Sequence, residues 1–287
     1  MKTAAEYKSD VKPTWCPGCG DFAVLNALEA ACAALGVEQK DLVTVSGIGC
    51  SSDLPHFLRA YGMHTLHGRA VAVAQGVKMA NTDLTVVVTG GDGDGYGIGV
   101  GHLIHAIRRN VDLTYIVMDN QVYGLTTGQT SPTSAKGAKT KSTPSGSVEN
   151  ALNPLALALA GGAGFVARGF SGDPVHLTEI LKRAVAHKGF SLVDVFSPCV
   201  TFNKANTYAW FRERVYRLEN EKHDPSNLGG ALQAALKEDG RLPIGVFYES
   251  SRPAFEEEDI TLKQGTLVKS RLGLTDQEWS AAVEEFL

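Results

Sequence analysis

The feature that most constrains the fold is the stretch from Leu84 to Thr130, in which a glycine-rich segment separates two β-branched runs. Residues 84–89 and 113–118 carry no charge, which is typical of strands buried on both faces of a sheet. Residues 99–109 place apolar side chains at helical spacing and end in two arginines, a pattern that favours a helix. Strand, helix and strand in this order predict a βαβ unit with a right-handed crossover.

Polar side chains follow both predicted strands. Asp92 comes after the first strand and Asn120 after the second, 28 residues later. Because ligands of such units bind beyond the carboxyl ends of the strands, we expect these two side chains to lie side by side there. A carboxylate and an amide oxygen suit a hard cation such as Mg2+. The glycines between positions 90 and 99 would let a diphosphate approach backbone N–H groups closely.

The glycine-rich segment GGDGDGYGIG has other interpretations, of which the simplest is a flexible turn. It is not the phosphate-binding GxxxxGK motif, and it lacks the GxGxxG dinucleotide pattern with an acidic residue about 20 positions later. The pairing of GDG with an asparagine one crossover later resembles the thiamine diphosphate motif instead. That pairing is more specific than either half alone.

The composition is that of an ordinary soluble protein. The chain has 287 residues, 44% hydrophobic and 20% charged, with a net charge of −4. Nothing in this balance calls for nucleic acid or an anionic membrane as a partner. The N-terminal MKTAAEYKSDVKPTW has no apolar core of a signal peptide, and no segment reaches the roughly 18 apolar residues of a spanning helix. We therefore expect a cytoplasmic protein.

The remaining pattern enlarges the βαβ unit into a sheet. It predicts helices at 21–35, 70–81, 151–160 and 174–187 and strands at 42–46, 165–170 and 190–196. This alternation indicates an α/β fold, a doubly wound parallel sheet of about five strands. In the first helix we expect Asp21 as the cap and Cys32 in the core.

The chain after residue 203 lacks this alternation. Residues 207–220 are amphipathic and predict a helix, whereas 221–287 show no regular pattern and 256–259 are interpreted as a solvated acidic turn. We therefore expect a cofactor-binding domain at 1–203 and a C-terminal extension at 204–287, a helix followed by a partner-contacting tail. The long irregular segment 124–150 follows Asn120 and could fold over a ligand.

Four of the five cysteines lie in loops beside glycine or proline. Cys16 and Cys19 form a CxxC, Cys50 follows 31 positions after Cys19, and Cys199 follows 149 positions after Cys50. A thioredoxin-like CxxC would follow a strand, and a zinc ribbon would supply a second CxxC within about 20 residues, so neither pattern fits. Four thiolates without a nearby histidine favour an iron–sulfur cluster, with a structural zinc ion as the alternative.

Together these motifs resemble the β subunits of the 2-oxoacid:ferredoxin oxidoreductases. The matching stretches span residues 15–216 and are WCPGCGDF, GIGCSSDLPHF, HTLHGRA, GGDGDGYGIGVGHLIHAIRRN, DNQVYGLTTGQTSPTS and SPCVTFNKANTYAWFRERVY. Within the family, SPCVTFN and HTLHGRA look closest to the 2-oxoglutarate type. The resemblance implies the thiamine diphosphate-binding fold and three cofactors: thiamine diphosphate, Mg2+ and one 4Fe–4S cluster.

The resemblance also implies which residues hold each cofactor. The cluster would be held by Cys16, Cys19, Cys50 and Cys199. Mg2+ would be held by Asp92, Asn120 and the backbone carbonyl of Val122. The thiamine site would be lined by Ile48, Gly49, Cys50, Ser51, His67, Gly93, Asp94, Gly124 and Leu125. His67, otherwise interpreted as a polar cap of the helix that follows it, becomes the candidate catalytic residue.

The implied reaction is the oxidative decarboxylation of 2-oxoglutarate with coenzyme A to an acyl-CoA, CO2 and reduced ferredoxin. Its reverse, which fixes CO2, is also open to this family. In the family the glutamate that activates thiamine belongs to a separate α subunit, so we expect an α partner, an (αβ)2 assembly and an external ferredoxin. Thr127 stands where some relatives carry a lysine that could pair a second carboxylate. Pyruvate or broad 2-oxoacid specificity is therefore an alternative, and a non-catalytic scaffold with zinc on its cysteines is another.

Overall fold

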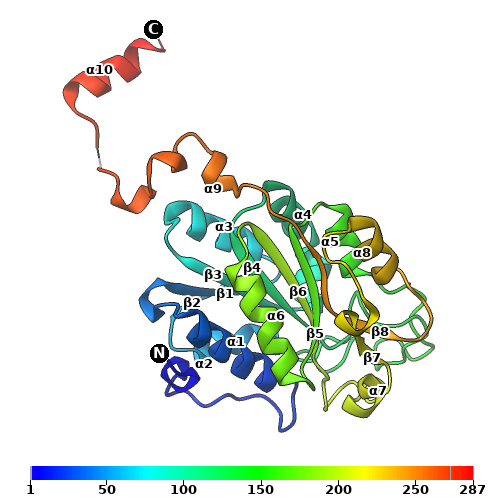
Figure 1. The fold of residues 1–287 in the computed structure, drawn as a ribbon. Helices are drawn as coiled ribbons and strands as arrows, with labels where there is room; N and C mark the ends of the chain where they lie inside the picture. The colour runs from blue at the N-terminus through cyan, green and yellow to red at the C-terminus, as the bar shows by residue number, and fades with distance from the viewer. Residues whose placement is uncertain (1, 272, 287) are drawn as a thin grey trace.

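The computed structural model of the protein describes residues 2–271 and 273–286, which are built around one eight-stranded sheet (Figure 1). The strands are β1 (Leu42–Ser46), β2 (Tyr61–His64), β3 (Thr85–Gly91), β4 (Leu113–Asp119), β5 (Phe165–Phe170), β6 (Phe190–Phe196), β7 (Val215–Arg217) and β8 (Leu242–Glu249). The helices are α1 (Asp21–Leu35), α2 (Leu54–Phe57), α3 (Ala70–Ala80), α4 (Val100–Arg109), α5 (Pro154–Ala160), α6 (Pro174–Ala186), α7 (Tyr208–Arg212), α8 (Leu228–Ala235), α9 (Phe255–Glu258) and α10 (Asp276–Glu284).

Helices cover both faces of the sheet, which confirms the predicted α/β, doubly wound class. Helices α1 and α6 pack on one face, and α3, α4, α5 and α8 pack on the other (Figure 1). Successive residues of β3 serve opposite faces, since Val86 and Val88 join one core cluster and Val87 joins the other. This double burial explains why the predicted strands read as continuous apolar runs.

The sheet order brings the loops that follow four strands to one edge of the sheet. Along the sheet the strands run β2-β1-β3-β4-β6-β5-β8-β7, and β1, β3, β4 and β6 are parallel neighbours. Their register pairs Ser46 with Thr89, Gly91 with Met118, and Asp119 with Phe196. The loops that follow these four strands therefore begin side by side, as the βαβ argument predicts for Asp92 and Asn120.

The glycine-rich segment is helical and is not a flexible turn. Residues Gly93–Ile98 form a π-helical segment with a kink at Gly97, and α4 follows it. None of the glycines from 90 to 99 has a positive φ. These glycines are therefore needed for close packing and not for a left-handed backbone conformation.

The structure corrects the prediction of about five strands and of a patternless chain after residue 220. Strand β8 pairs antiparallel with β5, and β7 pairs with β8 in parallel, so two strands from the predicted extension join the sheet. Pro243 and Gly245 interrupt the β pattern of β8, and its pairing with β5 overrides this weak local signal. The helix predicted at 207–220 is too long, because α7 ends at Arg212 and β7 follows within the predicted span. The division after residue 203 stays a prediction.

Part of the predicted acidic turn is buried. Both side-chain oxygens of Glu256 accept from the Asp112 backbone N–H, at 3.2 and 3.3 Å, and the buried Lys78 ammonium lies 3.9 Å from Glu256 Oε1. The expectation of a fully solvated turn is therefore wrong for Glu256. Beyond α9 the chain leaves the sheet, and α10 lies away from the main body (Figure 1). None of the described helices combines the length and apolar character needed to cross a membrane.

Candidate active site

A cavity at the carboxyl edge of the sheet gathers the predicted thiamine and magnesium residues. Its walls come from the loops after β1, β3 and β4 and from the segment before α3. The predicted thiamine residues Ile48, Gly49, Cys50, Ser51, His67, Gly93, Asp94, Gly124 and Leu125 all line it. So do the predicted magnesium residues Asp92, Asn120 and Val122. The structure thus brings the twelve residues together, while their roles as ligands stay predictions.

Asp92 begins the glycine-rich segment in a buried position. The Thr133 hydroxyl oxygen lies 2.6 Å from Asp92 Oδ2 and 2.8 Å from Asp119 Oδ1. A hydroxyl carries one proton and cannot donate fully to two ionised carboxylates. Burial raises the pKa of Asp92 to about 6 and holds that of Asp119 well above its usual range. A bound divalent cation would offset the cost of ionising Asp92, so this position fits a metal ligand.

Asn120 ties the loop after β4 to the loop of Cys199. Its Oδ1 accepts from the Val122 backbone N–H at 3.0 Å, which closes a tight turn. Its backbone carbonyl accepts from the Asn203 side-chain amide, also at 3.0 Å. The orientation of Asn120 therefore depends on a residue more than 80 positions away.

Asp94 joins three loops of the cavity. Its Oδ1 accepts from the Ile48 and Gly68 backbone N–H groups at 2.9 and 2.8 Å. The same oxygen lies 2.7 Å from His67 Nδ1, and because an ionised carboxylate only accepts, His67 Nδ1 is the donor. His67 is half-buried and leaves Nε2 for the cavity, whereas the N-cap of α3 is Arg69. His67 is therefore not the helix cap of the simpler interpretation.

Two glycines of the site are required by close packing. A Cβ on Gly47 would lie 2.1 Å from Asp94 Oδ2, and one on Gly93 would lie 2.1 Å from Tyr123 Cε1. The Tyr123 hydroxyl donates to the Gly93 carbonyl at 3.1 Å, which closes the loop after β4 against the glycine-rich segment. Any side chain at these two glycines would push the loops apart.

A second cavity adjoins the first and is lined by the four loop cysteines, Cys16, Cys19, Cys50 and Cys199. The two cavities share wall residues, namely Cys50, Asn120, Gly124 and Leu125. A Cβ on Gly124 would lie 3.7 Å from Cys199 Sγ and 3.8 Å from Cys50 Sγ, so this glycine faces both thiols. Cys32 is buried in the core of α1, as predicted.

The four loop thiols are not already arranged as a zinc site. Zinc held by four thiolates would bring their sulfurs to about 3.8 Å from one another. Among the described residues, the one group whose ligand atoms lie within 4.8 Å of one another is Asp53, His56 and His64, so no three of the sulfurs do. A cluster core between the sulfurs fits this wider spacing. Burial raises the pKa of Cys50 to about 11 and that of Cys19 further, so binding a cationic centre would release protons.

Asp21 does not cap α1, which corrects the sequence prediction. The N-cap is Gly20, and Asp21 Oδ1 accepts from the Ser197 hydroxyl at 2.7 Å. Burial raises the pKa of Asp21 to about 6. This hydrogen bond links the loop of Cys16 and Cys19 to the loop of Cys199. A carboxylate buried this deeply needs a donor, and the Ser197 hydroxyl supplies it.

Sequence reasoning missed Thr133, Tyr123 and Asn203 as parts of the site. All three lie within the matched stretches DNQVYGLTTGQTSPTS and SPCVTFN, but no spacing rule distinguishes them from their neighbours. Their roles arise from contacts between loops.

Comparison with known proteins identifies the relatives of this chain. Residues 47–195 match the family described as thiamine pyrophosphate enzyme, C-terminal TPP binding domain. Residues 199–264 match the family of the C-terminal part of the pyruvate ferredoxin oxidoreductase beta subunit.

Individual relatives agree with these families. A 2-oxoacid:ferredoxin oxidoreductase subunit beta from Sulfolobus sp is 49% identical over 256 residues, 85% of this chain and 84% of the relative. A 2-oxoglutarate synthase subunit KorB from Methanocaldococcus jannaschii is 39% identical over 264 residues, 90% and 96% of the two chains. Among solved structures, a 2-oxoglutarate:ferredoxin oxidoreductase from Magnetococcus marinus, with 2-oxoglutarate, coenzyme A and succinyl-CoA bound, superposes with a TM-score of 0.91. That chain is 45% identical, and the match covers 98% of this chain and 96% of the other.

Proposed function

This chain belongs to the β subunits of the 2-oxoacid:ferredoxin oxidoreductases, and we propose that it carries the thiamine diphosphate, Mg2+ and 4Fe–4S centres of a 2-oxoglutarate-specific enzyme. The products would be succinyl-CoA, CO2 and reduced ferredoxin. The reverse direction, CO2 fixation, uses the same site.

The observation that carries the proposal is the common wall of the two cavities. Cys50, Asn120, Gly124 and Leu125 face both the predicted thiamine site and the predicted cluster site. Thiamine diphosphate, when bound, would supply a nucleophilic carbon for the 2-oxoacid carbonyl and an electron sink for decarboxylation. A cluster on the other side of this wall would take the electrons of the oxidation over a short distance, which an oxidoreductase requires and a non-redox decarboxylase does not.

The chain's own groups have defined tasks in this proposal. Asp92, Asn120 and the Val122 carbonyl would hold Mg2+ against the diphosphate, with Thr133 fixing the Asp92 carboxylate. Asp94 orients His67 through Nδ1, so that Nε2 is free to bind or move a proton in the cavity. Cys16, Cys19, Cys50 and Cys199 would hold the cluster as thiolates.

The proposed active site needs a partner chain. No glutamate lines the predicted thiamine cavity in the part of the chain that the structure describes. The carboxylate that activates thiamine would then come from an α subunit, in an (αβ)2 assembly that passes electrons to an external ferredoxin in the cytoplasm. The names of the relatives as β subunits support this arrangement.

The substrate assignment rests on the 2-oxoglutarate relatives, and Thr127 marks where it can be tested. Thr127 lies in the loop after β4 with a φ of 77°, next to Thr126 of the cavity wall. Its hydroxyl offers a hydrogen bond but no positive charge to a second carboxylate. A preference for pyruvate over 2-oxoglutarate would move the assignment to the alternative of pyruvate or broad specificity.

The test is metal analysis and spectroscopy on the chain co-purified anaerobically with its α subunit. We expect about four iron and four sulfide per β chain, and an EPR signal of the reduced cluster when 2-oxoglutarate and coenzyme A are added. Pyruvate in place of 2-oxoglutarate should give a much weaker signal. Zinc on the four cysteines in place of iron would contradict the proposal and favour the non-catalytic scaffold.

A further inference from the structure

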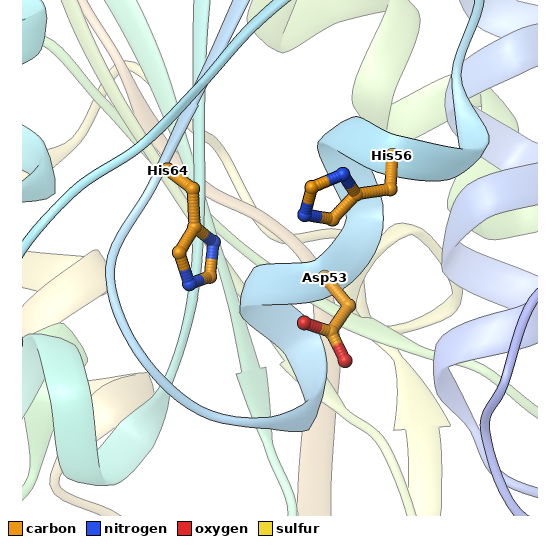
Figure 2. Close-up of side chains that lie close together, drawn as sticks. All are labelled: Asp53, His56 and His64. Carbon is orange, nitrogen blue, oxygen red and sulfur yellow. The ribbon is translucent and has the colours of Figure 1, made fainter.

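Three side chains that are not among the predicted cofactor ligands form a compact group near the two cavities. Asp53, His56 and His64 each offer one ligand atom, and these atoms lie within 4.8 Å of one another. Figure 2 shows the two imidazole rings opposite each other, with the carboxylate beside them. None of the three residues lines the predicted thiamine cavity, and only Asp53 lines the cysteine cavity.

The fold holds the group on two neighbouring elements. Asp53 is the N-cap of α2, and His56 lies three residues later on the same face of that helix. His64 is the last residue of β2 and pairs in register with Ser46 of β1. One helical turn thus supplies two candidate ligands, and the adjacent strand supplies the third.

Two of the three side chains make no other polar contact within the described chain, and the third keeps one ring nitrogen for a metal. In the described residues, 2–271 and 273–286, neither the Asp53 carboxylate nor the His56 ring makes a side-chain hydrogen bond, and no lysine or arginine pairs with Asp53. His64 Nδ1 lies 3.1 Å from the Ser46 hydroxyl and 3.2 Å from the Ser52 carbonyl. Because the carbonyl can only accept and the hydroxyl can also accept, a proton on Nδ1 satisfies both contacts. The neutral ring then keeps a free lone pair on Nε2. A backbone carbonyl that fixes the tautomer in this way is typical of metal-binding histidines.

We propose that Asp53, His56 and His64 form a binding site for a divalent transition-metal ion of the zinc type, separate from the predicted magnesium and cluster sites. Two imidazoles and one carboxylate are ligands that suit Zn2+, whereas Mg2+ prefers oxygen ligands alone. His56 and His64 are exposed and Asp53 is partly exposed, so small side-chain rotations can bring the three atoms to coordination distance. Water would occupy the remaining position.

The experiment is equilibrium dialysis of the anaerobic complex of this chain with its α subunit against zinc chloride. Zinc and iron are measured on the same sample, because zinc could enter the four-cysteine site only as iron is lost. We expect one zinc per β chain with the iron content unchanged. His56→Ala should weaken zinc binding by at least about tenfold. His105→Ala, which removes an exposed histidine of α4, is the matched control and should bind zinc as the wild type does.

Asp53→Asn provides an independent variant, since it keeps the size of the side chain and removes its charge. It too should weaken zinc binding, and a large excess of magnesium chloride should not displace zinc from the wild type. Wild-type complex that binds no zinc beyond the background would overturn the proposal. Equal zinc binding by wild type and His56→Ala, or by wild type and Asp53→Asn, would likewise show adventitious binding elsewhere.

Discussion

Asp92 is the residue at which burial and predicted metal binding are most directly coupled. Its carboxylate is 1% exposed, and burial raises its pKa to about 6. We predict that Asp92→Ala lowers thiamine diphosphate affinity at least about a hundredfold, because the Mg2+ bridge loses a charged ligand. Calorimetric titration of the α-containing complex with Mg2+ and thiamine diphosphate measures this. Iron content should stay at the wild-type level, and unchanged thiamine affinity would rule out the magnesium assignment.

A substitution at Cys199 should have the opposite effect, a loss of iron without a loss of thiamine binding. The Cys199 Sγ accepts from the Phe202 backbone N–H at 3.4 Å and, like Cys50 Sγ, lies near Gly124. We predict that Cys199→Ser removes most of the iron and leaves thiamine binding intact, since a hydroxyl replaces a cluster thiolate. Cys32→Ala is the control, because Cys32 lies in the core away from the cavity. Full iron content in Cys199→Ser would contradict the four-cysteine site.

At the scale of elements, the π-helical segment Gly93–Ile98 tests the packing argument for the glycines. A Cβ on Gly95 would lie 2.2 Å from the buried Tyr115 hydroxyl of β4. We predict that Gly95→Ala lowers the free energy of unfolding by about 1–3 kcal/mol, which thermal unfolding can measure. Gly101→Ala in α4 meets no atom within 4 Å and should instead stabilise the helix, by up to about 1 kcal/mol. If Gly95→Ala unfolded with the same free energy as the wild type, close packing against Tyr115 would not be the reason for this glycine.

A hydrogen bond to Glu256 connects helix α9 to the segment that precedes β4. The Glu256 carboxylate accepts from the Asp112 N–H at 3.2 Å, and Lys78 lies 3.0 Å from the Asp112 carboxylate. We predict that Glu256→Ala costs about 1–3 kcal/mol and increases hydrogen exchange at residues 253–260, because a half-buried N–H loses its acceptor. Glu258→Ala, at an exposed position of the same helix, should change neither quantity. Equal exchange in both variants would show that α9 is held by other contacts.

At the scale of the whole molecule, the proposed active site needs a residue from a partner chain. The described chain provides the cavity walls, the predicted metal ligands and the cysteines, but no glutamate in the predicted thiamine cavity. We predict that the β chain alone binds its cluster yet turns over 2-oxoglutarate at less than about one-thousandth of the rate of the αβ complex, because the activating acid is missing. Ferredoxin-reduction assays before and after adding purified α subunit measure this. Full activity of the β chain alone would exclude the shared active centre.

The sequence by itself determined the fold class, the central elements and the family. The βαβ unit, the placement of Asp92 and Asn120 at one edge, and the core position of Cys32 follow from short-range periodicity and from the geometry of parallel strands. The family also followed from the sequence, because the order and spacing of its motifs survive in the chain and were confirmed by the relatives.

Only the tertiary structure decided how distant segments meet. The pairing of β8 with β5, the hydrogen bond from Thr133 to Asp92, and the grouping of Asp53 and His56 with His64 join residues without any shared local pattern. Strand β8 contains proline and glycine, which disfavour strands. Glu256, in an acidic segment that looked solvated, accepts a hydrogen bond from the half-buried Asp112 N–H. Such choices depend on burial and on unsatisfied polar groups that exist only once the chain has folded, so local periodicity cannot encode them.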